Sequence, residues 1–185
     1  MLEAARKIVA DLGAWERRAP ARLRVKLVDR EGIKPGAKYY EWELRGIPLR
    51  IELGPRDLDK NACVAARRDN REKTSLPLDG LAPAVGALLD DIQKQMLAAA
   101  RDRREKNSIR EPVTYDRFRE LMEGEGAFVY AGWNGDPAVE ARVKAETKAT
   151  IRCLPDAEFQ TSPKPARCMV TGEAAKHEVV WARSY

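Results

Sequence analysis

The sequence predicts an α/β domain followed by a smaller α+β domain. Short runs of alternating apolar and polar residues favour strands, and helical spacing of apolar residues separates them up to about residue 106. This succession is typical of an α/β domain. After Pro112 the pattern restarts, and 185 residues suit one large domain or two small ones.

The first domain is expected to begin with a helix over 2–12, where apolar residues recur with helical spacing and Gly13 marks the stop. Pro35-Gly36 and Gly54-Pro55 predict turns. The other elements expected here are strands over 23–28, 49–53, 62–66 and 71–76, a short helix over 38–45 and a long helix over 81–106.

The second domain contains two helix starts. Thr114 is a candidate N-cap for a predicted helix that ends at Met122, and Pro137, after Asp136, takes a favourable first-turn position in one over 137–148. Strands are expected over 126–132, 149–154 and 179–183, and an exposed, mobile loop over 155–167. We place the domain boundary within 105–112, which gives domains over 1–108 and 109–185.

Composition narrows the function. The net charge of +5 and the pI of about 9.2 favour a polyanionic partner, nucleic acid first, although an ordinary basic soluble protein has the same balance. No apolar run approaches the roughly 20 residues of a membrane-spanning helix, and the charged N-terminus does not resemble a signal peptide. Three cysteines without a close pair indicate a reducing compartment, so we expect a cytoplasmic protein without disulfides.

The common nucleotide-binding and redox motifs are missing from the sequence. The sequence has no G-x-x-x-x-G-K-[ST] phosphate loop, no G-x-G-x-x-G after a strand and no C-x-x-C. A small cysteine-dependent enzyme would need His177, the only histidine, beside Cys153 or Cys168. No third residue that would orient such a pair is evident, so this alternative has little support.

The run from Asp29 to Leu58 places cations, carboxylates and a tryptophan around two short apolar stretches. Read by itself, Glu43 is a helix-surface charge, Arg50 and Glu52 pair with neighbours across a strand, and Arg56 and Asp57 form an ion pair in a turn. Such charge runs are usually solvated faces.

Three motifs in this order resemble the prolyl-tRNA synthetase family. The run over 29–58 is similar to the family's D-x-R-x-x-x-x-P-G-x-K-x-x-E-W-E-L-K-G-[VI]-P-x-R-[IV]-E-[IL]-G-P-[RK]-D-L. The segment 147–155 resembles T-x-A-T-x-R-C-[IV]-P, and 179–185 resembles V-[VL]-F-A-[KR]-[AS]-Y. The resemblance covers essentially the whole chain and indicates the archaeal-like branch, which has an additional C-terminal domain.

The resemblance implies a mixed-sheet anticodon-binding domain, with its first strand apparently missing, and a C-terminal domain. The implied partner is tRNA(Pro). The full-length enzyme is a homodimer that uses ATP and Mg²⁺ to attach proline to tRNA. Its catalytic domain is absent here, so we expect this chain alone to bind tRNA without charging it. The alternative is a stand-alone RNA-binding module with a regulatory or scaffold role.

The resemblance also implies which residues bind RNA. Proline anticodons contain two guanines, whose O6 and N7 accept hydrogen bonds from cations and whose N1 and N2 donate to carboxylates. The implied anticodon readers are Glu43, Arg50, Arg56, Asp57 and Lys73. Weaker candidates are Lys34 and Lys38 for phosphates and Trp42 for stacking, although core packing suits Trp42 better. In the full enzyme, the terminal Tyr185 carboxylate would reach toward the active site.

Zinc-bearing relatives carry four cysteines in the C-terminal domain. The matching positions here are Asn134, Val139, Cys168 and Thr171, which leave one thiol. Structural zinc needs four Cys or His ligands, so we expect no metal. Packing by Val139 and hydrogen bonds from Asn134 and Thr171 would replace it.

Overall fold

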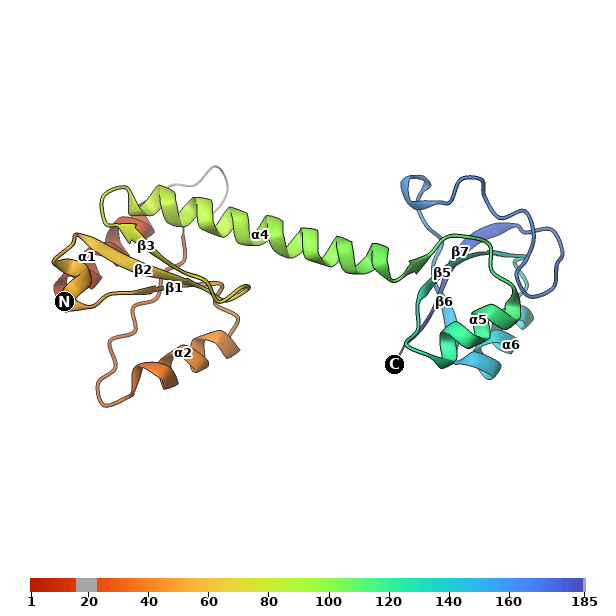
Figure 1. The fold of residues 1–185 in the computed structure, drawn as a ribbon, viewed down its shortest axis with the longest axis horizontal. Helices are drawn as coiled ribbons and strands as arrows, with labels where there is room; N and C mark the ends of the chain where they lie inside the picture. Colours follow the sequence, from red (N-terminus) through yellow and green to blue (C-terminus); the bar gives the residue numbers. More distant parts are fainter. Residues whose placement is uncertain (16–22, 185) are drawn as a thin grey trace. The chain divides into compact units, whose positions relative to one another are not determined.

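The computed structural model describes residues 1–15 and 23–184, so Tyr185 and its expected role lie outside the described residues. The chain forms two compact units, Met1–Ala99 and Ala100–Tyr185. The division falls inside helix α4 (Leu81–Lys106), before the stretch in which the sequence placed the boundary (Figure 1). In the described part of the chain, no helix is both long and apolar enough to cross a membrane.

The first unit is built on an antiparallel sheet in the order β1 (Leu49–Glu52), β2 (Ala62–Arg67) and β3 (Lys73–Pro77). Alternate side chains of a strand point to opposite faces. One face therefore presents Leu49, Ile51, Cys63 and Leu76 to a core that Leu12, Leu81 and Val85 complete. The other face carries Arg50, Glu52 and Lys73, whereas Arg67 of β2 lies on the core side and contacts α4.

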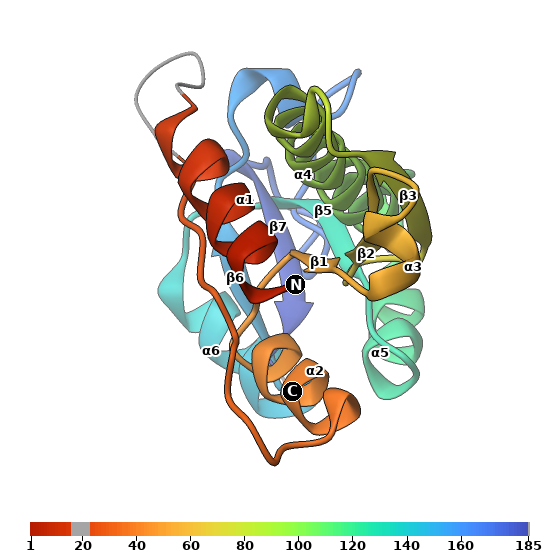
Figure 2. The same cartoon turned by 90° about the vertical axis from the view of Figure 1, so that its left-hand side faces the viewer.

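Helices cover the two faces unequally. Helices α1 (Leu2–Ala14) and α4 supply the core side, whereas α2 (Pro35–Leu44) lies on the opposite side of the sheet (Figures 1 and 2). The short α3 (Pro55–Leu58) follows β1. Helix α2 has no fully buried residue, so its contacts with the sheet are made by half-buried side chains.

The prediction of a strand over 23–28 is wrong. This segment forms no described strand; Leu23 packs on the core, while Val25 is 37% exposed. A pattern of alternating apolar residues indicates which side chains are favourably buried, but a strand also needs a neighbouring strand with which to form hydrogen bonds. No described strand pairs with this segment.

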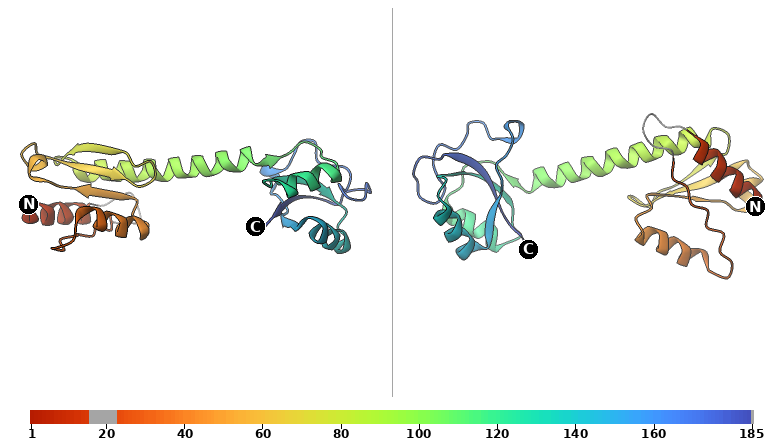
Figure 3. Two further views of the ribbon diagram at one scale, coloured as in Figure 1. Left: turned by 60° about the horizontal axis from the view of Figure 1, so that its bottom comes forward. Right: turned by 180° about the vertical axis from the view of Figure 1, so that it is seen from behind.

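The second unit contains a four-stranded sheet in the order β4 (Ser108–Ile109), β5 (Phe128–Trp133), β7 (His177–Arg183), β6 (Ala149–Cys153). Helices α5 (Tyr115–Glu123) and α6 (Pro137–Thr147) pack against it (Figure 3). The buried core includes Phe118, Met122, Val143 and Trp181. A single turn of 3-10 helix, Ala157–Phe159, interrupts the loop that precedes β7.

The predicted cap at Thr114 is confirmed, and the structure adds a second cap at Asp136. Thr114 Oγ1 accepts from the Arg117 backbone N–H at 3.2 Å, and Asp136 Oδ1 accepts from that of Ala138 at 2.8 Å. The mixed α/β class predicted from the sequence is confirmed as well.

Candidate nucleic-acid interface

Arg50 lies at the centre of a charged cluster on the outer face of the first sheet. Its Nε donates to Glu52 Oε1 at 2.9 Å, and its Nη2 lies 2.9 Å from the same oxygen in an ion pair. Its Nη1 donates to Glu43 Oε1 on α2 at 3.0 Å. The structure therefore brings together Glu43 and Arg50, two of the predicted anticodon readers, and includes Glu52, which the sequence analysis expected only to pair with a neighbour across the strand.

Lys73 joins this cluster from β3. Its Nζ lies 3.0 Å from Glu52 Oε2, so one carboxylate holds two cations from two strands. The strand register explains the meeting, because Arg50 pairs with Ala66 and Ala66 pairs with Lys73. The small side chain between them leaves room for the cations to approach each other.

Tyr39 is the member of the cluster that the sequence analysis missed. The Arg50 guanidinium carbon lies 3.8 Å from the centre of the Tyr39 ring, and Lys73 Nζ lies 6.0 Å from it. Cations are attracted to the faces of aromatic rings. The available signal was the four-residue spacing of Tyr39 and Glu43, which puts both on one side of a helix.

Helix α2 divides its acidic residues between two sets of cations. Glu43 contacts Arg50, whereas Glu41 pairs with Arg30 and with Arg45. The hydrogen bond from Arg30 lowers the pKa of Glu41 below its ordinary value and outweighs the opposing effect of desolvation. Both carboxylates of α2 are therefore paired with arginines, and Arg50 is the basic residue that β1 contributes to the cluster.

The remaining predicted readers lie on α3. Asp57 Oδ2 accepts from the Gly54 backbone N–H at 2.8 Å and so closes the turn that begins α3. Within the described residues Arg56 is exposed and has no hydrogen-bond or ionic partner, so the alternative Arg56–Asp57 ion pair does not form. Arg56 is accordingly available for an external partner.

The weaker candidates occupy different environments. Lys34 is exposed at the start of α2, and Lys38 is half-buried one turn later. Trp42 is half-buried, with the Arg45 guanidinium 4.9 Å from its ring centre. Its indole N–H is buried without an acceptor among the described residues. Trp42 thus contributes to the packing of α2 on the sheet.

The positions that match zinc ligands do not form a metal site. Val139 is buried, and the side chains of Asn134 and Thr171 donate to Glu173 Oε2 at 2.7 and 3.1 Å. Burial raises the pKa of the Cys168 thiol, but hydrogen bonds from the Thr171 hydroxyl and nearby backbone N–H groups bring it below the ordinary value. Among the described residues no cluster of three His, Cys, Asp or Glu side chains could hold a metal.

The cysteine-dependent alternative finds no geometry in the described residues. His177 lies beside Trp133, with the ring centres 6.1 Å apart, and makes no described contact with Cys153 or Cys168. Cys168 is buried, whereas Cys153 is exposed on β6. A nucleophile and a base within hydrogen-bonding reach are therefore not brought together.

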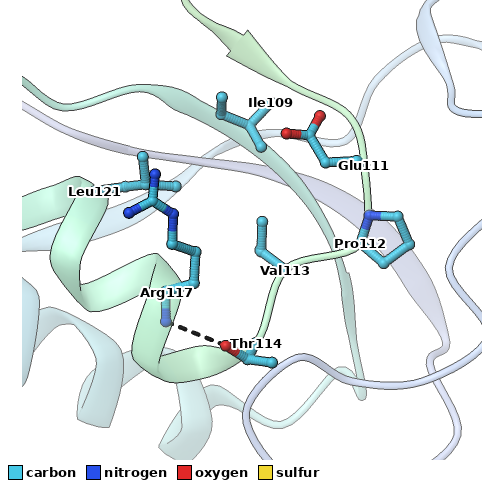
Figure 4. A pocket seen from close by; sticks show the side chains of 7 residues that line it. All are labelled: Ile109, Glu111, Pro112, Val113, Thr114, Arg117 and Leu121. Carbon is cyan, nitrogen blue, oxygen red and sulfur yellow. Dashed lines mark hydrogen bonds between the residues drawn. The ribbon is translucent and has the colours of Figure 1, made fainter.

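The second unit also has an open hollow of about 270 Å³ between β4 and α5 (Figure 4). Its walls are mainly apolar, from Ile109, Val113 and Leu121, and the figure shows Glu111 and Arg117 at different parts of its rim. It contains no cluster of cations that would bind a polyanion. The charged face of the first unit is therefore the better candidate site.

Two protein-family models match the chain. The family described as "Anticodon binding domain" matches residues 1–88, and the family described as "Prolyl-tRNA synthetase, C-terminal" matches residues 115–185. The charged cluster lies wholly within the first match. Cys168 and the other positions that match zinc ligands lie within the second match.

Curated relatives and solved structures agree with these matches. A proline–tRNA ligase of Porphyromonas gingivalis is 42% identical over 163 residues, which are 88% of this chain and 32% of the relative. Proline–tRNA ligase 2 of Clostridioides difficile is 40% identical over 186 residues, 100% of this chain and 36% of the relative. A crystal structure of prolyl-tRNA synthetase from Cryptosporidium parvum, complexed with L-proline and AMP, has a TM-score of 0.81 at 30% identity and covers 100% of this chain and 37% of that one.

The chain thus spans about a third of the length of the curated relatives it matches. Its two units match the anticodon-binding and C-terminal regions of those proteins in sequence, and the solved structure covers both. By these matches the chain belongs to the prolyl-tRNA synthetase family.

Proposed function

We propose that the first unit binds the anticodon of tRNA(Pro) through the outer face of its sheet. The observation that carries the proposal is the cluster of Glu43, Arg50 and Lys73, held together by half-buried Glu52 between α2 and the sheet, within the match to anticodon-binding domains. Arg56 and Asp57 on α3 complete the proposed reading set. Lys34 and Lys38 are proposed phosphate contacts, and Trp42 a secondary stacking contact.

The chemistry of guanine fits this set. A guanidinium or ammonium donates to the acceptors O6 and N7, and a carboxylate accepts from N1 and N2. Single-stranded loops expose these base edges for recognition by proteins. The pairing of Arg50 with Glu43 therefore offers one group for each edge of guanine at adjacent positions.

We propose that the complete reaction, which attaches proline to tRNA, needs a protein longer than these 185 residues. We infer that activation of proline with ATP and Mg²⁺, transfer to tRNA and the homodimer contacts use residues outside these 185, since the relatives are about three times as long. The 185 residues are proposed to act in the cytoplasm as the tRNA-binding part, without zinc. Charging of tRNA with proline by this chain alone would contradict this division, and an aminoacylation assay measures it.

The decisive experiment is a filter-binding comparison of proline anticodon stem-loops. Replacing either anticodon guanine by adenine should weaken binding by about tenfold or more, since a good bidentate contact discriminates by roughly 1–3 kcal/mol. Arg50→Met should abolish this preference, whereas Arg142→Met, a matched control in the second unit, should keep it. Binding that ignores the bases and falls steeply with salt would instead indicate a general RNA-binding module.

A further inference from the structure

The charged cluster contains two residues that hold others in place. Glu52 accepts from both Arg50 and Lys73, and its side chain is only 19% exposed. Tyr39 places its ring against the Arg50 guanidinium from the helix above the sheet. Arg50 is therefore enclosed from two directions, by a carboxylate on its own strand and by an aromatic face on α2.

The contacts of Arg50 differ in how readily they can be exchanged. Two of its nitrogens share Glu52 Oε1, and this carboxylate also holds Lys73, so a change there would disturb two cations. The third, Nη1, is paired with Glu43, whose side chain is 43% exposed and has no second described cation. An incoming acceptor can replace Glu43 at Nη1 while Glu52 and Tyr39 stay in place.

Ordering of Arg50 before binding has a thermodynamic consequence. Free arginine and lysine side chains lose much rotamer entropy when they are fixed by a ligand. A guanidinium that is already stacked and hydrogen-bonded loses less, so more of the interaction appears as affinity and as discrimination between bases.

We propose that Tyr39 and Glu52 are positioning residues of the RNA site, which align Arg50 and Lys73 as a fixed pair of donors. Glu43 is the exchangeable partner that covers Arg50 Nη1 until RNA arrives. This inference rests on the proposed anticodon-binding function. It adds two residues whose role is to orient the reading residues rather than to contact the anticodon bases.

The test uses the 185-residue chain and anticodon stem-loops in which 7-deazaguanine replaces guanine, since this base lacks the N7 acceptor. Wild type should bind the substituted RNA about tenfold more weakly than the guanine RNA. Tyr39→Leu and Glu52→Gln should reduce this ratio to about one. Tyr39→Phe, which keeps the ring, should preserve it.

A second readout separates positioning from general damage. The Arg50 Nε–H signal in a nitrogen-15 NMR spectrum should be protected from water exchange in wild type and Tyr39→Phe, and unprotected in Tyr39→Leu, while the unfolding midpoint changes little. If Tyr39→Leu keeps both the RNA ratio and the protection, the positioning role is wrong. If wild type binds the guanine and 7-deazaguanine RNAs equally well, the proposed anticodon-binding function is contradicted. The NMR comparison still decides whether Tyr39 and Glu52 order Arg50.

Discussion

Each unit contains a tyrosine, an arginine and a glutamate connected by contacts, but the two clusters are connected differently. In the second unit, Tyr115 Oη donates to Glu146 Oε2 and Arg142 Nε donates to Glu146 Oε1, both at 2.8 Å. In the first unit, Tyr39 offers its ring face, 3.8 Å from the Arg50 guanidinium, and Glu43 reaches the same arginine. Only the second cluster joins all three residues through polar atoms.

The difference teaches which arginines are structural. The Tyr115 cluster connects α5 to α6, and two other arginines of the unit reach backbone carbonyls. Arg183 Nη1 donates to the Met122 carbonyl at 2.7 Å, and Arg110 Nη1 to that of Phe159 at 2.8 Å. A carbonyl cannot move away without disturbing the chain, whereas the Glu43 side chain can. The partner of an arginine is therefore more informative than its presence beside a tyrosine.

The largest expected effect comes from Gly132→Ala, which disrupts the second unit. A Cβ at Gly132 would lie 2.2 Å from the Arg167 carbonyl oxygen, so the backbone at Arg167 must shift. We expect a loss of more than about 3 kcal/mol of unfolding free energy, measured by urea denaturation. Gly13→Ala is the control, since no atom lies within 4 Å of its Cβ.

Amide hydrogen exchange in Gly132→Ala tests whether the loss of stability is confined to the second unit. Amides of β5 and β7 should lose protection in Gly132→Ala, while amides of β1 and β3 should keep theirs. Equal loss in both sheets would show that the Arg50 cluster depends on the second unit. Unchanged stability would contradict the close approach at Gly132.

Arg67→Leu should have the next largest effect, because it removes a third kind of arginine contact. Arg67 is 7% exposed and donates to Asp69 at 2.7 Å and to Asp91 at 2.6 Å, which ties β2 to α4. Removing the cation leaves two carboxylates unpaired, one of them largely solvated. We expect a loss of about 2 kcal/mol, measured by urea unfolding at neutral pH.

The same variant should change the response to acid. The hydrogen bond from Arg67 lowers the pKa of Asp69 below its ordinary value of 3.8. The stability that this pair contributes is present above the unfolded pKa and is lost as pH falls through the lower folded value. Wild type should therefore lose stability below about pH 4, and Arg67→Leu should lose less over the same range. Parallel pH profiles would contradict the pair.

Tyr115→Phe tests the polar connection of the second cluster and should cost about 1 kcal/mol at neutral pH. Burial, then the hydrogen bond and charge of Glu146, raise the pKa of Tyr115 to about 12. A neutral phenol is favoured in the folded state, so its contribution is present below the unfolded pKa near 10 and is lost as pH rises through 12. Unfolding midpoints should show this alkaline loss in wild type and in Tyr39→Phe, but not in Tyr115→Phe.

Local patterns predicted much of the fold. The expected long helix over 81–106 coincides with α4, and the capping role of Thr114 is confirmed because it depends on neighbouring residues alone. The error at 23–28 arose because strand formation depends on a distant neighbour.

The site was less accessible to sequence reasoning. Alternation placed Arg50 on the face of β1 opposite the core, but its meeting with Lys73 depends on the register through Ala66. The Tyr39 stack depends on how α2 lies over that sheet. These are tertiary properties, and the RNA-reading role of the cluster stays a prediction.

Glu43→Gln should have the smallest effect on stability and the most informative one. Glu43 is 43% exposed, and Arg50 keeps both bonds to Glu52 when Glu43 is neutralised, so urea unfolding should not distinguish this variant from wild type. Glu146→Gln is the matched change in the second unit. It weakens the bonds from both Arg142 and Tyr115, and its unfolding midpoint should fall measurably.

RNA binding completes the contrast between these two glutamates. Inosine lacks the N2 amino group of guanine, so an inosine-substituted anticodon loop should bind wild type more weakly than the guanine loop does. This difference should shrink in Glu43→Gln, whose amide oxygen is a weaker acceptor than a carboxylate, and should stay unchanged in Glu146→Gln. A similar loss of stability in both variants would mean that Glu43 connects α2 to β1 as Glu146 connects α6 to α5. A carboxylate that RNA discrimination needs and stability does not is one held for an external partner, because a purely structural contact would show the reverse.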